Sequence, residues 1–147
     1  MSNYIHFMET ARIISLISRI RDKANRLIVN ELRVRHLSGL APSHGDILFL
    51  LFHLEPVSMR EIAKKIGRDK STVTALIKKL MDFGYVEKEQ DQNDSRVTLI
   101  KLTKSGRALR QYFDEISGIL LERVYNGFTE KEKEVIIHGL GKINNNL

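Results

Sequence analysis

The residues between Arg60 and Lys79 have the chemistry of a surface that binds a polyanion. The twenty residues of this segment carry seven basic and two acidic side chains, a net charge of +5, in a chain whose net charge is +6. Lysine and arginine neutralise phosphates, and short hydroxyl side chains reach base edges or phosphates. Residues of both kinds lie close together after position 69: Lys70, Ser71, Thr72, Thr74, Lys78 and Lys79. This combination favours nucleic acid as the partner, although a solvated charged face is the plainer explanation.

A second charged pair lies further along the chain. Asp94 and Arg96 are separated by one residue in a polar stretch, 91–95, that is typical of a turn. Asp-x-Arg is common by chance, so the pair gains its weight only from the strands expected on either side.

Several other kinds of chemistry are excluded by the residues present. The chain has no cysteine, which excludes a thiol nucleophile, a disulfide framework, a cysteine zinc site and a thiol redox sensor. None of the five histidines lies three or four residues from another, so no helix carries a metal clamp. The sequence has neither a nucleophile elbow nor a Walker loop. We therefore expect no enzyme activity, no cofactor and no metal ion.

The elements that must position these residues are mainly helices. Apolar residues recur at helical spacing and predict helices over about 5–37, 42–55, 59–66, 70–83, 104–124 and 130–143. Side chains of the types that cap helices precede most of them. The expected N-caps are Ser58, Asp69, Thr103 and Thr129, with Ser43 and Asp46 as a capping box in the second helix.

A β-hairpin is expected directly after the basic helix. Residues 85–90 and 97–102 read as strands that flank the polar turn. Two short helices joined by a glycine-containing turn and followed by a hairpin have the order of a winged helix-turn-helix. The expected fold is therefore mainly α with a small β-hairpin wing, and the lobe 56–103 is expected to bind DNA through a helix in the major groove.

The helices on either side of this lobe carry more apolar surface than the lobe can cover. They belong to the segments 1–37 and 105–147 and can pack as an intrachain bundle or across a two-fold axis. We expect a homodimer, because a two-fold protein reads a pseudopalindromic operator and gains specificity that one small reading head lacks. Since no linker or repeat divides the chain, 1–147 is expected to be a single domain.

Five separated segments resemble the MarR family of bacterial and archaeal transcription regulators. They read LAPSHGDIL (40–48), EIAKKI (61–66), STVTALIKKL (71–80) with GYV (84–86), DSR (94–96) and LTKSG (102–106). The resemblance implies a homodimer with interlocked terminal helices, a recognition helix in each major groove and a wing at the flanking minor groove. It also implies repression of nearby genes, relieved by a small aromatic or phenolic molecule that binds between the dimer helices and the DNA-binding lobe.

The resemblance also assigns roles in the recognition helix. Ser71 and Thr72 match positions that commonly touch bases or phosphates, and Thr74 matches a frequent threonine of the family. Ala75 departs from the pattern, because many members have an arginine there that can reach a base. The operator would then be read more through its shape, through thymine methyl groups or through added lysine charge.

The remaining residues expected at the DNA interface are basic or belong to the wing. Lys70, Lys78 and Lys79 are expected to neutralise phosphates. Asp94 and Arg96 match the wing motif of the family, in which the carboxylate orients the arginine that enters the minor groove. The residues of any ligand pocket are unknown from the sequence.

Two other functions are compatible with parts of the sequence, namely protein binding and membrane attachment. A winged-helix adaptor that binds protein would need neither the +5 segment nor an arginine at the wing tip, and it should expose more aromatic side chains. The basic first helix could attach to anionic membranes, but it lacks tryptophan and its apolar stripe is needed inside the protein. The longest apolar run is six residues, 47–52, and the N-terminus does not resemble an export signal, so we expect a cytoplasmic protein.

Overall fold

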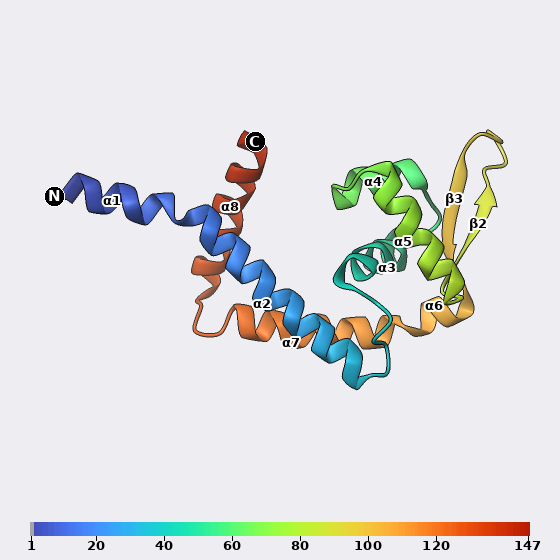
Figure 1. The fold of residues 1–147 in the computed structure, drawn as a ribbon, viewed down its shortest axis with the longest axis horizontal. Helices are drawn as coiled ribbons and strands as arrows, with labels where there is room; N and C mark the ends of the chain where they lie inside the picture. The colour runs from blue at the N-terminus through green and yellow to red at the C-terminus, as the bar shows by residue number, and fades with distance from the viewer. Residues whose placement is uncertain (1) are drawn as a thin grey trace.

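The computed structural model describes residues 2–147; Met1, part of the expected domain 1–147, lies outside the described residues. Long helices lie at one end of the molecule and a small sheet lies at the other (Figure 1). The fold is mainly α with a β-hairpin wing, as the sequence predicted. The elements are α1 (Ser2–Ala11), α2 (Ile13–Val34), α3 (Pro42–Leu54), β1 (Val57–Ser58), α4 (Met59–Ile66), α5 (Lys70–Asp82), β2 (Val86–Gln90), β3 (Thr98–Leu102), α6 (Lys104–Ala108), α7 (Arg110–Val124) and α8 (Glu130–Asn146).

The sheet has three antiparallel strands in the order β1-β3-β2. The predicted hairpin is present, with Val86 opposite Leu102 and Gln90 opposite Thr98. The strand β1 was not predicted from the sequence. It has two residues, which is too short for the alternating pattern that marks a strand.

Most of the predicted helix starts are confirmed. The side chains of Ser58, Asp69, Thr103 and Thr129 each accept a hydrogen bond from a backbone N–H in the first turn of the helix that follows. The capping box expected from Ser43 and Asp46 is wrong. Pro42 is already the first residue of α3, so Ser43 lies inside the first turn; Ala41 is the N-cap, and its N–H donates to His44 Nδ1 at 2.9 Å.

Two of the predicted helices are each interrupted once. The first divides into α1 and α2 at Arg12, where Thr10 Oγ1 donates to two carbonyl oxygens of α1 and Ser15 Oγ donates to the Arg12 carbonyl. Hydroxyl groups that bond to carbonyls of the preceding turn bend helices. The helix after the wing divides at Leu109, whose N–H bonds to the Gly106 carbonyl three residues back and tightens the turn.

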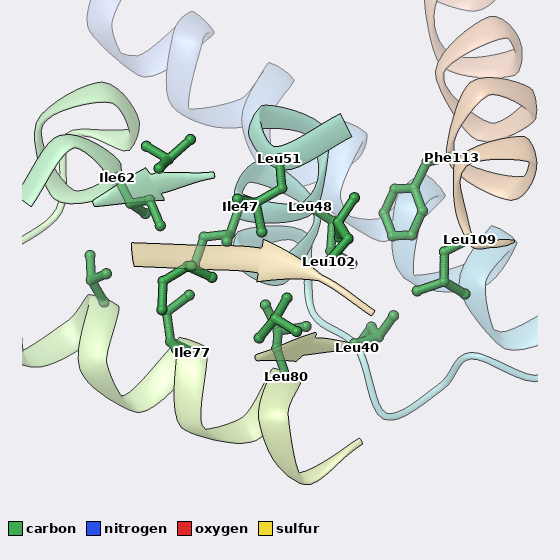
Figure 2. Packing of buried hydrophobic residues seen from close by; sticks show 14 of the residues in the cluster. Leu40, Ile47, Leu48, Leu51, Ile62, Ile77, Leu80, Leu102, Leu109 and Phe113 are labelled. Carbon is green, nitrogen blue, oxygen red and sulfur yellow. The ribbon is translucent and has the colours of Figure 1, made fainter. Parts of the chain in front are cut away.

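The hydrophobic core lies between α3, α4, α5 and the sheet (Figure 2). Buried side chains from α5 and β3 contact those of α3. Leu109 and Phe113, at the start of α7, cover one edge of the core. Because α5 and the sheet pack on the same core, the wing lies beside α5. The side chains with the least exposure are Ile47, Leu48, Leu51, Ile62, Ile77, Leu80 and Ile100.

The helices outside the core leave large apolar side chains uncovered. In the described part of the chain α8 has no buried residue, and Val135 and Ile137 are 60% and 58% exposed. In α1, Tyr4 and Phe7 are 69% and 64% exposed. No helix among residues 2–147 is long and apolar enough to cross a membrane.

Candidate nucleic-acid interface

The basic face of α5 is set by the residues that the helix buries. Val73, Ile77 and Leu80 point into the core, so the polar face of the helix is turned outward. Thr72 is half-buried. The other predicted residues of this helix are exposed: Lys70, Ser71, Thr74, Ala75, Lys78 and Lys79.

Hydrogen bonds fix the hydroxyl groups at the start of α5. Ser71 Oγ donates to Asp69 Oδ1 at 2.8 Å, and Thr74 Oγ1 donates to the Lys70 carbonyl at 2.8 Å. The N–H of Thr72 and then the Ser71 hydroxyl lower the pKa of Asp69, so the carboxylate that caps the helix stays charged. Since the hydroxyl protons are engaged within the protein, these oxygens are free to accept hydrogen bonds from outside it.

The wing carries the predicted pair of Asp94 and Arg96 in direct contact. Asp94 Oδ1 accepts from the backbone N and from Nε of Arg96, both at 3.0 Å, and Oδ2 accepts from Nη2 at 3.2 Å. The guanidinium group, and then the backbone N–H, lower the pKa of Asp94. The arginine is therefore held in one orientation at the surface.

A groove of about 690 Å³ lies between α5, the start of α4 and the wing. It brings together three of the predicted site residues, Lys70, Thr74 and Arg96. Its other lining residues are Ser58, Met59, Arg60, Val73, Lys88, Val97 and Thr98. The lining thus combines four cations with two threonines, a serine and three apolar side chains.

Arg60 and Lys88 were not among the residues predicted for the site. Arg60 lies in the basic segment that the sequence singled out, at the start of α4. Lys88 could have been found from strand alternation, because it follows the buried Val86 by two residues and shares its face of β2. The acidic residues of β2 are on the opposite face, where Lys101 Nζ lies 2.8 Å from Glu89 and 3.6 Å from Glu87.

The remaining predicted residues do not line the groove. Ser71, Thr72, Ala75, Lys78, Lys79 and Asp94 lie outside its lining. Lys79 is near the C-terminal end of α5, with Nζ 5.9 Å from the centre of the Phe83 ring. The structure therefore divides the predicted set into residues of the groove and residues beside it.

A buried histidine lies in α3, which packs against α5. His44 is 3% exposed; its Nδ1 accepts from Ala41, whereas Nε2 has no hydrogen-bond partner among the described residues. Burial, and then the charge of Lys79, lower the pKa of His44. The imidazole is therefore neutral at pH 7. Within residues 2–147, no group of three or more histidine, aspartate or glutamate side chains is arranged to hold a metal ion.

Comparison with known sequences finds transcription regulators. The model of the MarR family matches residues 40–98. The HTH-type regulator YcgE of Bacillus subtilis is 33% identical over 105 residues, which cover 71% of this chain and 68% of YcgE. The regulator YdgJ of the same organism is 26% identical over 110 residues, 75% of this chain and 67% of YdgJ. SarZ of Staphylococcus aureus is 30% identical over 88 residues, 60% of this chain and 57% of SarZ.

Comparison with solved structures finds the same fold. The MepR–DNA complex of S. aureus matches with a TM-score of 0.83 at 23% identity, covering 90% of this chain and 96% of MepR. A mutant MarR of E. coli in complex with operator DNA gives a TM-score of 0.81 at 23% identity, covering 93% and 96%. The chain belongs to the MarR family, whose members are winged-helix transcription regulators rather than enzymes.

Proposed function

We propose that the chain is a homodimeric, sequence-specific DNA-binding repressor that a small aromatic or phenolic ligand releases from its operator. The observation that carries the proposal is the cationic groove between α5 and the wing, lined by Arg60, Lys70, Lys88 and Arg96. These cations lie on α5 and on the elements beside it. They can neutralise phosphates along a DNA groove while α5 reads the bases in that groove. That two structural neighbours are complexes with DNA supports the same partner.

In this proposal α5 enters the major groove and the wing reaches the adjacent minor groove. Ser71, Thr72, Thr74 and Ala75 contact bases or nearby phosphates, and Asp94 orients Arg96 for the minor groove. Lys70, Lys78 and Lys79 neutralise phosphates, so the lobe 56–103 is the DNA-binding part of the single domain 1–147.

The segments 1–37 and 105–147 form the dimer interface in this proposal. The exposed apolar side chains of α1 and α8 support it, because monomeric proteins rarely leave contiguous apolar surface of this kind in water. Two copies related by a two-fold axis would read a pseudopalindromic operator with half-sites one or two helical turns apart. A regulator of this type acts where the genome lies, which agrees with the expected cytoplasmic location.

Selection of bound fragments from the genomic DNA of the source organism tests the proposal. We expect recovered sites with two-fold symmetry, and we expect a planar aromatic acid to weaken binding to them. Dilute peroxide should have little effect, because the chain has no cysteine to oxidise. Recovery of fragments without a common sequence, at an affinity equal to that for random DNA, would contradict sequence-specific regulation.

A further inference from the structure

The carboxylate of Glu55 joins three elements at the base of the wing. Its Oε2 accepts from the backbone N–H of Leu102, the last residue of β3, at 2.7 Å. Its Oε1 accepts from Arg107 in α6, with Nε at 3.0 Å and Nη2 at 2.9 Å. Glu55 itself follows the last residue of α3. One side chain therefore connects the core helix, the wing and the helix that leads to α7.

The sheet explains why a carboxylate is needed at this point. In the pairing of β1 with β3, Val57 lies opposite Ile100, so the same register would bring Glu55 opposite Leu102. The strand β1 begins only at Val57, after Pro56. The N–H of Leu102 consequently has no strand partner on this side, and the Glu55 side chain supplies the missing acceptor. A charged acceptor makes a stronger hydrogen bond than a carbonyl would.

At the base of the wing, β2 is held to β3 by contacts that do not involve Glu55. The N–H of Thr103 donates to the Tyr85 carbonyl at 3.0 Å, and Thr103 Oγ1 donates to the Gly84 carbonyl at 2.5 Å. Gly106 packs so closely against this strand that a Cβ there would collide with the carbonyl oxygen of Tyr85. These contacts hold the two strands together at their base, whereas the Glu55 bonds hold the wing against α3.

We propose that Glu55 is a positioning residue that sets the inclination of the wing and thereby directs Arg96 to DNA. The inference rests on the proposed function, because it assumes that Arg96 contacts the operator. Arg96 lies six positions before Leu102, in the turn beyond β3, and six residues of extended chain span at most roughly 20 Å. A tilt of about 10° at the base would therefore displace the tip by up to about 3 Å, enough to withdraw the arginine from the minor groove.

Operator binding by single and double variants tests this role. Glu55→Ala should weaken binding to a selected operator roughly three- to tenfold, a part of the effect expected from Arg96→Ala. In the Arg96→Ala background the same change should have less than about a twofold effect, because the contact that Glu55 serves is already absent. Glu55→Gln keeps an acceptor for Leu102 but loses the charge, so it should retain the fold and weaken binding less.

Two controls separate positioning from general stability. Glu89→Gln removes a carboxylate from the 2.8 Å pair with Lys101 on the face of β2 opposite the groove, and it should not weaken binding. Amide hydrogen exchange at Leu102 should accelerate in Glu55→Ala, while the amide of Ile100, whose residue is opposite Val57, stays protected. Unchanged exchange at Leu102 would overturn the proposal.

The double variant distinguishes this inference from the proposed function. If Arg96→Ala weakens operator binding and Glu55→Ala adds its full effect in that background, the positioning role is wrong and the function stands. If Arg96→Ala leaves operator binding unchanged, the proposed wing contact is wrong and the role of Glu55 fails with it.

Discussion

Asp94 binds the guanidinium group of Arg96 with both carboxylate oxygens, yet the arginine side chain remains 89% exposed. The pair is thus ordered without being buried. An exposed ion pair stabilises the fold little, because water screens it and ordering the side chains costs entropy. Its value lies in an arginine that is already oriented before DNA arrives.

Replacing Arg96 with alanine should weaken operator binding by about 1–3 kcal/mol per half-site and reduce the preference for A·T-rich flanks. The reason is that an arginine in a narrow minor groove recognises both its potential and its width. Titration of operators with altered flanks measures both effects. Equal weakening on every sequence would show that Arg96 contacts only phosphates.

Replacing Asp94 with alanine should also weaken operator binding, although the change removes a negative charge. An arginine freed from its carboxylate loses more side-chain entropy when it enters the groove. Electrostatic attraction alone predicts the opposite sign. Titration at fixed salt decides between them, and tighter binding than that of the wild type would overturn the orienting role of Asp94.

Replacing Lys79 with alanine should weaken binding to all DNA sequences alike. Lys79 lies outside the groove, near the end of α5, so it is expected to contact phosphate rather than bases. The slope of log K against log salt should fall by about one unit for each phosphate that the variant no longer neutralises. A change in sequence preference with an unchanged salt slope would contradict a phosphate contact.

The buried imidazole of His44 predicts a loss of stability in acid. Its pKa is lowered from 6.5 by burial, so below that pH the unfolded chain binds the proton more readily than the folded chain. The contribution to stability is present above pH 6.5 and is lost as the pH falls through the lower pKa of the folded state. Urea unfolding at several pH values should therefore show a steeper decline for the wild type than for His44→Gln, whose amide oxygen can still accept from Ala41.

His53→Gln is the matched control, because this histidine is exposed and belongs to the same helix as His44. The loss of stability in acid is compared between the two variants and the wild type. An equal slope for His44→Gln and the wild type would mean that protonation of His44 does not govern acid stability.

Light scattering should give the wild type a mass near twice 17.0 kDa. Ile137→Asp brings a charge to the exposed apolar face of α8 and should shift the protein to a monomer with weaker operator binding. Ser38→Asp, at an exposed position outside both terminal segments and the DNA-binding lobe, is the control for added charge. A wild-type protein that is monomeric in light scattering and still binds the operator tightly would contradict the proposed dimer interface.

Local signals in the sequence predicted much of the fold. Asp69 and Thr103 cap helices through contacts three residues away, so their roles are visible in the sequence itself. The expectation for Ser43 failed because Pro42 starts α3 one residue earlier. The break at Arg12 depends on how the Thr10 and Ser15 hydroxyls turn, and helical spacing does not report on that.

Contacts between distant residues account for what was missed at the candidate site. Lys88 and Arg60 line the same groove only because the sheet brings the wing beside α4. Glu55 is 47 residues from Leu102 and carries no motif of its own. In contrast, the contact between Asp94 and Arg96 was predictable, because both residues belong to one short turn.

The arrangement of the wing also bears on aggregation. As the outermost strand in the order β1-β3-β2, β2 has one edge that pairs with no strand of the described chain. Such an edge can recruit a strand from another molecule. Glu87, Lys88 and Glu89 make this edge strand densely charged, which disfavours edge-to-edge stacking. The charges of β2 therefore protect its open edge against pairing with a strand of a second molecule.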